Sequence, residues 1–207
     1  RSVGNRGILV VVEDGRRAAL RGLSLDEVAR VLCPGGKAWI GRPDEAVSRK
    51  LQQGVPGCEV LESPSGAVIL RKKRPEGMDE WTHWLHSPEG NNHSQDTLVG
   101  PGGSIQWIDG PTWLNGVNIT ELFAGGRSFN LFALPQPGEA QLIARDAFNG
   151  VVLWTRVIRS AGAQYNPRLL AAVGDRVYAV TDRNGPAVAL DAATGEPVKV
   201  FDQGSSP

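Results

Sequence analysis

The spacing of hydrophobic and polar positions differs between the first third of the chain and the remainder. Residues 7–12 form a continuous apolar run rich in β-branched side chains, as expected of a buried strand. Apolar residues then recur at helical spacing over residues 25–32. The rest of this part predicts strands at 37–40 and 66–70 and a short helix at 44–53. The alternation of strands and helices predicts a small α/β unit over residues 1–70.

Local signals place the ends of the first helix. Ser24 is a plausible N-cap, and Glu27 three positions later completes a capping box. Pro34-Gly35-Gly36 then ends the helix, because proline and paired glycines cannot continue it.

The second part of the chain contains a repeat. The sequence Asp-Ala-x-x-Gly occurs at residues 146–150 and again at 191–195, an offset of 45 positions. The segments around each copy contain strand and turn signals, and within each copy we expect the Asp carboxylate to accept backbone N–H groups and the Gly to adopt a left-handed conformation. A period of about 40–50 residues of this kind is typical of a β-propeller blade.

The fold class that follows is mixed: a small α/β remnant, then a mainly-β partial propeller of about two four-stranded antiparallel blades. The strands of the two copies are expected at 129–134, 141–145 and 151–157, and at 177–181, 187–190 and 197–201. A further strand is expected at Ser104–Ile108, after a loop that begins at Asp79. The high content of Gly (26) and Pro (14) among the 207 residues suits a turn-rich β protein.

Charge and hydropathy exclude some partners. The 22 basic and 22 acidic residues leave no net charge, so nothing in the composition favours nucleic acid or an acidic membrane surface. No apolar run approaches the roughly 18 residues of a transmembrane segment. The chain begins with Arg1 and stops directly after a repeat, so we expect it to be part of a longer protein.

The run Leu32-Cys33-Pro34-Gly35-Gly36 after a helix resembles a turn late in class I S-adenosylmethionine-dependent methyltransferases. That family holds its cofactor on a glycine-rich loop after its first strand, and this sequence has no such loop. The resemblance therefore implies that residues 1–70 are the C-terminal part of a methyltransferase-like domain. Residues 71–78 follow as a basic linker, which we interpret as a solvated connector rather than a nucleic-acid contact.

Residues 79–207 resemble the start of a bacterial β-propeller with pyrroloquinoline-quinone (PQQ)-type repeats, the quinoprotein alcohol dehydrogenase-like family. The resemblance rests on the Trp-Thr-His run at 81–83, the Asn-x-x-Ser run that follows it, and the repeat itself. It implies that the aromatic residue after each Asp-Ala-x-x-Gly docks against the neighbouring blade. Trp154 matches that position, whereas Phe201 lies two places further on. Export is usual for such propellers, whereas a methyltransferase-like domain favours the cytoplasm, so the compartment stays open.

Candidate chemistry gathers in one short segment. His83, His86 and His93 lie within eleven positions, beside three acidic residues, Asp79, Glu80 and Asp96. They predict either a metal site or, as we favour, side chains that hydrogen-bond a loop beside packed tryptophans. We therefore expect no metal site.

Other candidates are structural or open. Asp146 with Arg145, and Asp191, recur once per repeat and are interpreted as turn residues rather than catalytic acids. Tyr165-Asn166-Pro167 would lie where a propeller lines its channel and could contact a ligand. Cys33 and Cys58 leave open a disulfide or, as favoured, two buried thiols.

The sequence thus predicts a binding or scaffolding propeller fragment without a complete active site, so that no catalytic residue is assigned and no cofactor site is identifiable. Its partners would be further blades, a protein or a small molecule. Two alternatives stay open. One is a piece of a quinoprotein oxidoreductase, with PQQ implied by resemblance only, and the other is a piece of a methyltransferase fused to a propeller.

Overall fold

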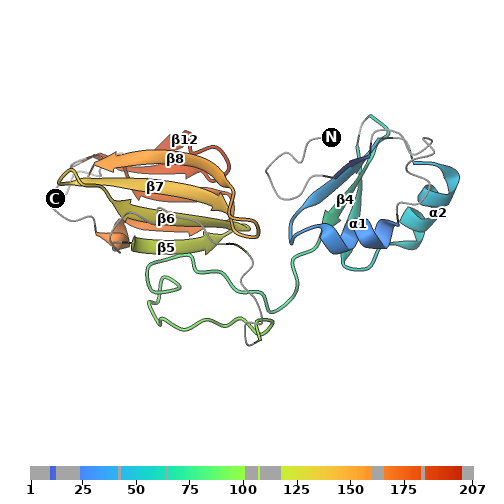
Figure 1. The fold of residues 1–207 in the computed structure, drawn as a ribbon, viewed down its shortest axis with the longest axis horizontal. Coiled ribbons are helices and arrows are strands. Elements are labelled where there is room, and N and C mark those ends of the chain that lie inside the picture. Colours follow the sequence, from blue (N-terminus) through green and yellow to red (C-terminus); the bar gives the residue numbers. More distant parts are fainter. Residues whose placement is uncertain are drawn as a thin grey trace. The chain divides into compact units, whose positions relative to one another are not determined.

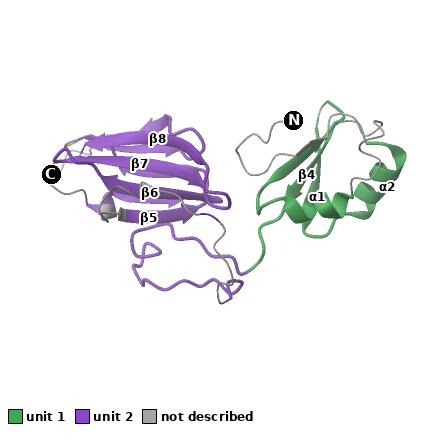
Figure 2. Cartoon of the chain, in the orientation of Figure 1, with its two compact units in different colours: residues 1–76 green, residues 77–207 purple. Residues whose placement is uncertain are grey.

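The computed structural model describes residues 10–12, 24–41, 43–63, 65–100, 107, 118–159, 166–182 and 185–201. The chain divides into two compact units, residues 1–76 and 77–207 (Figure 2). None of the helices in the described ranges is long and apolar enough to cross a membrane.

The first unit is a four-stranded mixed sheet with two helices. Its elements are β1 (Val10–Val12), α1 (Leu25–Val31), β2 (Lys37–Ile40), α2 (Glu45–Gln53), β3 (Cys58–Glu62) and β4 (Val68–Lys72) (Figure 1). The strand order is β1-β2-β4-β3, in which β1 is parallel to β2 and the other pairs are antiparallel. The strands and helices expected from the sequence are therefore present, and β3 is an additional strand that was not predicted.

Both helices of the first unit begin at a capping residue, but one contact of the first cap differs from the sequence prediction. Ser24 caps α1, but its hydroxyl accepts the N–H of Asp26 at 3.2 Å. Glu27 accepts from Arg30 at 2.8 Å. The predicted capping-box pairing of the Ser24 hydroxyl with Glu27 was thus wrong, because that hydroxyl accepts the N–H one position earlier. Asp44 caps α2 by accepting the N–H of Val47.

The start of the expected linker belongs to the sheet. Arg71 and Lys72 lie in β4. Arg71 pairs with Glu59 on the neighbouring strand, and the Lys72 ammonium donates to the carbonyl of Ala29 at 2.7 Å. These two cations are therefore used within the first unit. Cys33 and Cys58 are both buried thiols, as favoured from the sequence, and burial raises the pKa of Cys58.

The second unit contains two four-stranded antiparallel sheets, so the expectation of a mainly-β second part is confirmed. The first sheet is β5 (Asn118–Ala124), β6 (Arg127–Ala133), β7 (Glu139–Asp146) and β8 (Val152–Arg159). The second is β9 (Leu170–Val173), β10 (Arg176–Val180), β11 (Ala187–Asp191) and β12 (Pro197–Val200), preceded by the 3₁₀ turn η2 (Pro167–Leu169). In each sheet the strands are ordered as they follow along the chain.

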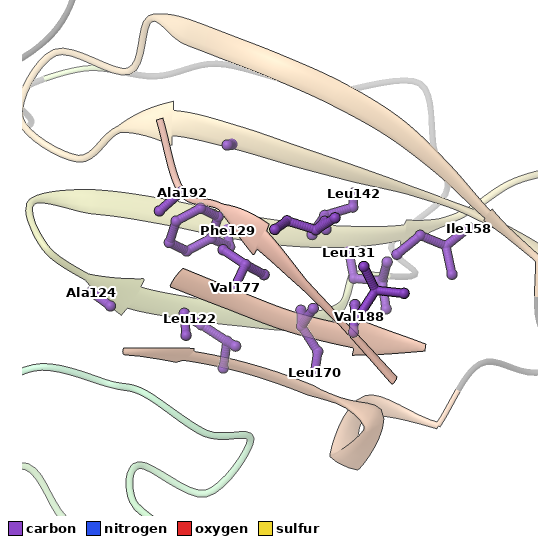
Figure 3. Packing of buried hydrophobic residues seen from close by; sticks show 14 of the residues in the cluster. Leu122, Ala124, Phe129, Leu131, Leu142, Ile158, Leu170, Val177, Val188 and Ala192 are labelled. Carbon is purple, nitrogen blue, oxygen red and sulfur yellow. The ribbon is translucent and has the colours of Figure 1, made fainter. Parts of the chain in front are cut away.

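A shared apolar core joins the two sheets (Figure 3). Alternate residues of the central strands face it, as the period of two along a strand requires. Phe129 and Leu131 of β6 and Val177 of β10 are completely buried there. Each sheet therefore buries one face against the other.

The two sheets also share their register. Arg127 lies opposite Asp146 in the first sheet, and Arg176 lies opposite Asp191 in the second. The two Asp-Ala turns therefore occupy equivalent places. Of the expected Ser104–Ile108 strand only Trp107 is described, and Tyr165 also lies outside the described residues.

Candidate ligand-binding site

The repeated turns are built as the sequence predicts. Asp146 Oδ1 accepts the N–H of Phe148 and Asn149, and Asp191 Oδ1 accepts the N–H of Ala193 and Thr194. The glycines that end the two turns, Gly150 and Gly195, each have a φ of 74°. The turn aspartates are thus occupied by backbone donors, which supports a structural role for them.

An indole ring packs on each of these turns. Trp154 Nε1 donates to the carbonyl of Ala192 at 3.0 Å, and its ring lies directly on Gly195, where an added Cβ would be 2.7 Å from Cδ2. Trp107 Nε1 donates in the same way to Ala147 at 3.1 Å, and its ring lies on Gly150. The prediction that Trp154 docks on the neighbouring sheet is confirmed.

A short segment joins the free edges of the two sheets. Trp81 pairs with Phe123 at the edge of β5, and His83 pairs with Ala171 at the edge of β9. The supporting hydrogen bonds run from Phe123 N–H to Trp81 O (2.7 Å) and from Ala172 N–H to Thr82 O (2.9 Å). Residues 81–83 therefore satisfy backbone groups that an open strand edge would expose.

The Asp79 carboxylate holds this segment in place. Its Oδ2 accepts from His86 Nε2 (2.7 Å) and from the N–H of Gln95 (2.7 Å), and Oδ1 accepts from the N–H of Glu80 (2.7 Å). Partial burial acts to raise the pKa of Asp79, but these donors outweigh it and hold the pKa far below its usual range. Asp79 is therefore ionised, and we call its carboxylate the hub of the loop because it accepts hydrogen bonds from several loop residues.

His86 is almost completely buried beside that hub. Its Nδ1 lies 3.2 Å from Asn91 Oδ1, and the same oxygen accepts the N–H of His93. Since Asn91 Oδ1 is thereby identified as an acceptor, both ring nitrogens of His86 face acceptors. Both ring nitrogens are therefore engaged by side chains of the loop, which favours a structural role for His86.

The remaining acidic candidates bind backbone groups. Asp96 accepts the N–H groups of Asp79, Val99 and Leu98, which lower its pKa. Glu80 accepts the N–H of Gly125 at 2.8 Å. Across the described parts of the chain, no three His, Cys, Asp or Glu side chains converge to hold a metal ion. The sequence cluster therefore brings Asp79 and His86 together as structural partners.

A hollow of about 400 Å³ lies beside this segment. It is formed between the loop 83–90 and the start of the second sheet. Nine residues line it: His83, Trp84, Leu85, Ser87, Pro88, Glu89, Gly90, Arg168 and Leu170. Its size falls within the range of roughly 300–1,000 Å³ that is usual for small-molecule sites. We therefore regard it as the candidate ligand-binding site.

Sequence reasoning found one side of this site and missed the other. His83 was a candidate, but Trp84 and Arg168 were not singled out. Arg168 lies 5.1 Å from the centre of the Trp84 ring, although the two residues are far apart in the sequence. The pairing of residues 81–83 with both sheet edges brings Arg168 and Trp84 together, and no local sequence pattern predicts this contact. Asn166, part of the expected channel contact, accepts the N–H of Arg168 at 3.0 Å.

Comparison with known proteins adds no identification. No family model, no curated protein and no solved structure matches the chain.

Proposed function

We propose that residues 77–207 form a binding and scaffolding module made of consecutive β-propeller blades of the PQQ-repeat type. The indole contact that occurs twice is the observation that carries this proposal. A tryptophan that precedes each Asp-Ala-x-x-Gly turn in the chain packs on the turn glycine and donates to the turn carbonyl. A contact repeated in the same form links sheets in series, as successive blades of a propeller are linked.

The outer face of the second sheet supports the same proposal. Ala124 and Phe129 of the first sheet are buried against the second sheet. Their counterparts by register, Val173 and Tyr178, are 52% and 37% exposed. An apolar face that is covered in one repeat and open in the next favours a further sheet on that side.

The first unit supports the methyltransferase-like assignment as a fold, without supporting the activity. The sheets of class I methyltransferases resemble this one, since they end in an antiparallel hairpin whose last strand inserts beside the preceding parallel strand. The order β1-β2-β4-β3 has this form. We propose that residues 1–70 are the back half of such a domain and serve the module as a folded neighbour.

The described residues do not fit the group that the quinoprotein alternative requires. That alternative calls for an acidic base with calcium and for two adjacent cysteines. In the described ranges no three His, Cys, Asp or Glu side chains converge to hold an ion, and the two cysteines are 25 positions apart, both in the first unit. We therefore derive no redox step for this chain.

A cofactor titration tests this proposal. PQQ with calcium should produce no saturable change in visible absorbance, and S-adenosylmethionine should release no heat in calorimetry. A saturable PQQ signal would replace the scaffolding role with the oxidoreductase alternative. Saturable binding of S-adenosylmethionine would favour the methyltransferase alternative instead.

A further inference from the structure

We propose that the hollow beside Trp84 binds a small organic acid that also carries an amine or a hydroxyl group. This inference deepens the binding role proposed above and gives it a ligand class. It does not depend on the number of blades or on the resemblance to quinoproteins.

Arg168 would supply the anchor for the acid. Its guanidinium lies 5.1 Å from the centre of the Trp84 ring, and a stacked guanidinium keeps the N–H groups along its edge. Those N–H groups match a carboxylate in a two-bond arrangement. The N–H of Arg168 is held by Asn166 Oδ1, so the backbone that carries the cation is fixed. Arg168 forms no ion pair with any other described residue.

Glu89 makes the hollow unsuitable for a bare polyanion. Its Oε2 accepts the Ser87 hydroxyl at 2.6 Å, and this hydrogen bond lowers the pKa of Glu89. The carboxylate therefore stays ionised at neutral pH. A ligand group near it must be a donor, such as an ammonium or a hydroxyl, because a second anion would be repelled.

His83 adds a second acceptor. Thr82 Oγ1 lies 3.2 Å from the His86 carbonyl and 2.8 Å from His83 Nδ1. The carbonyl can only accept, so Thr82 satisfies both contacts when its hydroxyl donates to the carbonyl and its oxygen accepts a hydrogen bond from Nδ1–H of His83. In the neutral ring this corresponds to the Nδ1–H tautomer of His83, which has a lone pair on Nε2.

The hollow thus combines one cation with two acceptors and an apolar wall of Leu85, Pro88 and Leu170. A carboxylate on Arg168 and a donor on Glu89 or His83 would match these groups. Two kinds of molecule carry this chemistry on a compact apolar body: zwitterionic amino acids and sugar acids.

Isothermal titration calorimetry with four probes tests the inference. Leucine and galacturonate each carry a carboxylate and a donor, whereas galactose lacks the carboxylate and propionate lacks the donor. We expect saturable binding of leucine or galacturonate, at least tenfold tighter than that of either truncated probe. Leucine binding identifies an amino acid as the ligand, and galacturonate binding identifies a sugar acid. Equal binding of a truncated probe, or no heat from any probe at 10-fold molar excess up to about 10 mM, overturns the proposal.

Two variants and a matched control locate the site. Arg168→Gln should weaken binding at least tenfold, since it removes the positive charge and the paired N–H donors of the guanidinium. Glu89→Gln should weaken leucine more than galacturonate, because an ammonium loses more than a hydroxyl when the carboxylate becomes neutral. Lys199→Gln removes another cation stacked on a ring, 4.8 Å above Phe201 and outside the hollow, and should change nothing. Unchanged binding in folded Arg168→Gln would overturn the assignment, whereas the scaffolding role would stand or fall by the cofactor titrations.

Discussion

The two sheets of the second unit share a turn but end differently. Asp146 and Asp191 organise identical turns, with the same hydrogen bonds and the same glycine conformation. The last strands then diverge. In β8, Trp154 lies opposite Ala144, and in β12 the equivalent place opposite Ala189 is taken by Lys199.

The two copies carry the same two side-chain types after the turn, an aromatic residue and a cation, but in opposite order. In the first sheet Trp154 lies on Gly195, and Arg156 two places later donates to the Gly195 carbonyl at 2.9 Å. In the second sheet the cation, Lys199, comes first and the aromatic residue, Phe201, comes second, with the ammonium over the ring. The sequence expectation that Phe201 departs from the pattern is therefore explained by a reversed order of the same pair.

This difference distinguishes the residues that stabilise a single sheet from the residues that join one sheet to the next. The turn aspartate and glycine act inside each sheet, and both copies retain them. The aromatic and cationic pair acts on the following sheet, and only the copy with a described following sheet uses it. The predictions below test this separation, in decreasing order of expected effect.

The largest effect should come from Trp154→Ala. It removes a ring that packs between the sheets together with a hydrogen bond, so the free energy of unfolding should fall by about 3 kcal/mol. Chemical denaturation measures it. Trp84→Ala is the matched control, because Trp84 is 37% exposed and its removal should lower stability by only about 1 kcal/mol. Equal losses in both variants would contradict a joining role for Trp154.

The second-largest effect is expected from Gly195→Ala. The alanine would have to adopt a φ of 74°, and its Cβ would overlap the Trp154 ring. Gly174→Ala has a similar positive φ of 57° with nothing within 4 Å, so it isolates the backbone cost of about 1–2 kcal/mol. The ring overlap should add about 1 kcal/mol to the loss in Gly195→Ala. Thermal unfolding of the two variants gives the difference, and its absence would mean that the ring does not rest on the turn.

A smaller effect is expected from Asp79→Asn, which weakens the segment that joins both sheet edges. Leaving its donors poorly satisfied should cost about 1–3 kcal/mol near neutral pH. The pKa of Asp79 is depressed in the folded chain, so its contribution is present above about pH 4 and is lost as the pH falls toward the lower folded value.

Denaturation as a function of pH checks this sign. The unmodified chain should lose stability below about pH 4 more steeply than Asp79→Asn. Asp175→Asn is the control, because its side chain is 78% exposed on a turn and should leave the slope unchanged. Parallel curves for the chain and for Asp79→Asn would contradict the role of Asp79 as the hub.

The smallest effect should come from Lys199→Trp, which restores the residue type of the first sheet. All of β12 is exposed, so an indole there meets no following turn among the described residues. The free energy of unfolding should change by less than about 0.5 kcal/mol, as measured by chemical denaturation. A gain of more than about 1 kcal/mol would show that the ring finds a partner within the same sheet.

Much of the fold could be predicted because its signals are local. The Asp-Ala-x-x-Gly turns and the cap at Ser24 use side chains that bond their own backbone within a few residues. β3 was missed because its alternation is interrupted by charged residues, and its pairing with β4 supplies what local pattern lacks. The site was only half predicted, since Arg168 and Trp84 meet through strand-edge pairing.

By itself, the sequence determined most of the strands, the repeated turns, the division of the chain into an α/β part and a β part, and the ring that would join two sheets. These depend on residue spacing and on short-range hydrogen bonds. Only the tertiary structure decided that Asp79 and His86 form a hub, that Lys199 and Phe201 reverse the pair of the first sheet, and that a hollow opens beside Trp84. Each of these depends on groups brought together from distant or differently registered segments, and such proximity is created by packing and not by neighbouring residues.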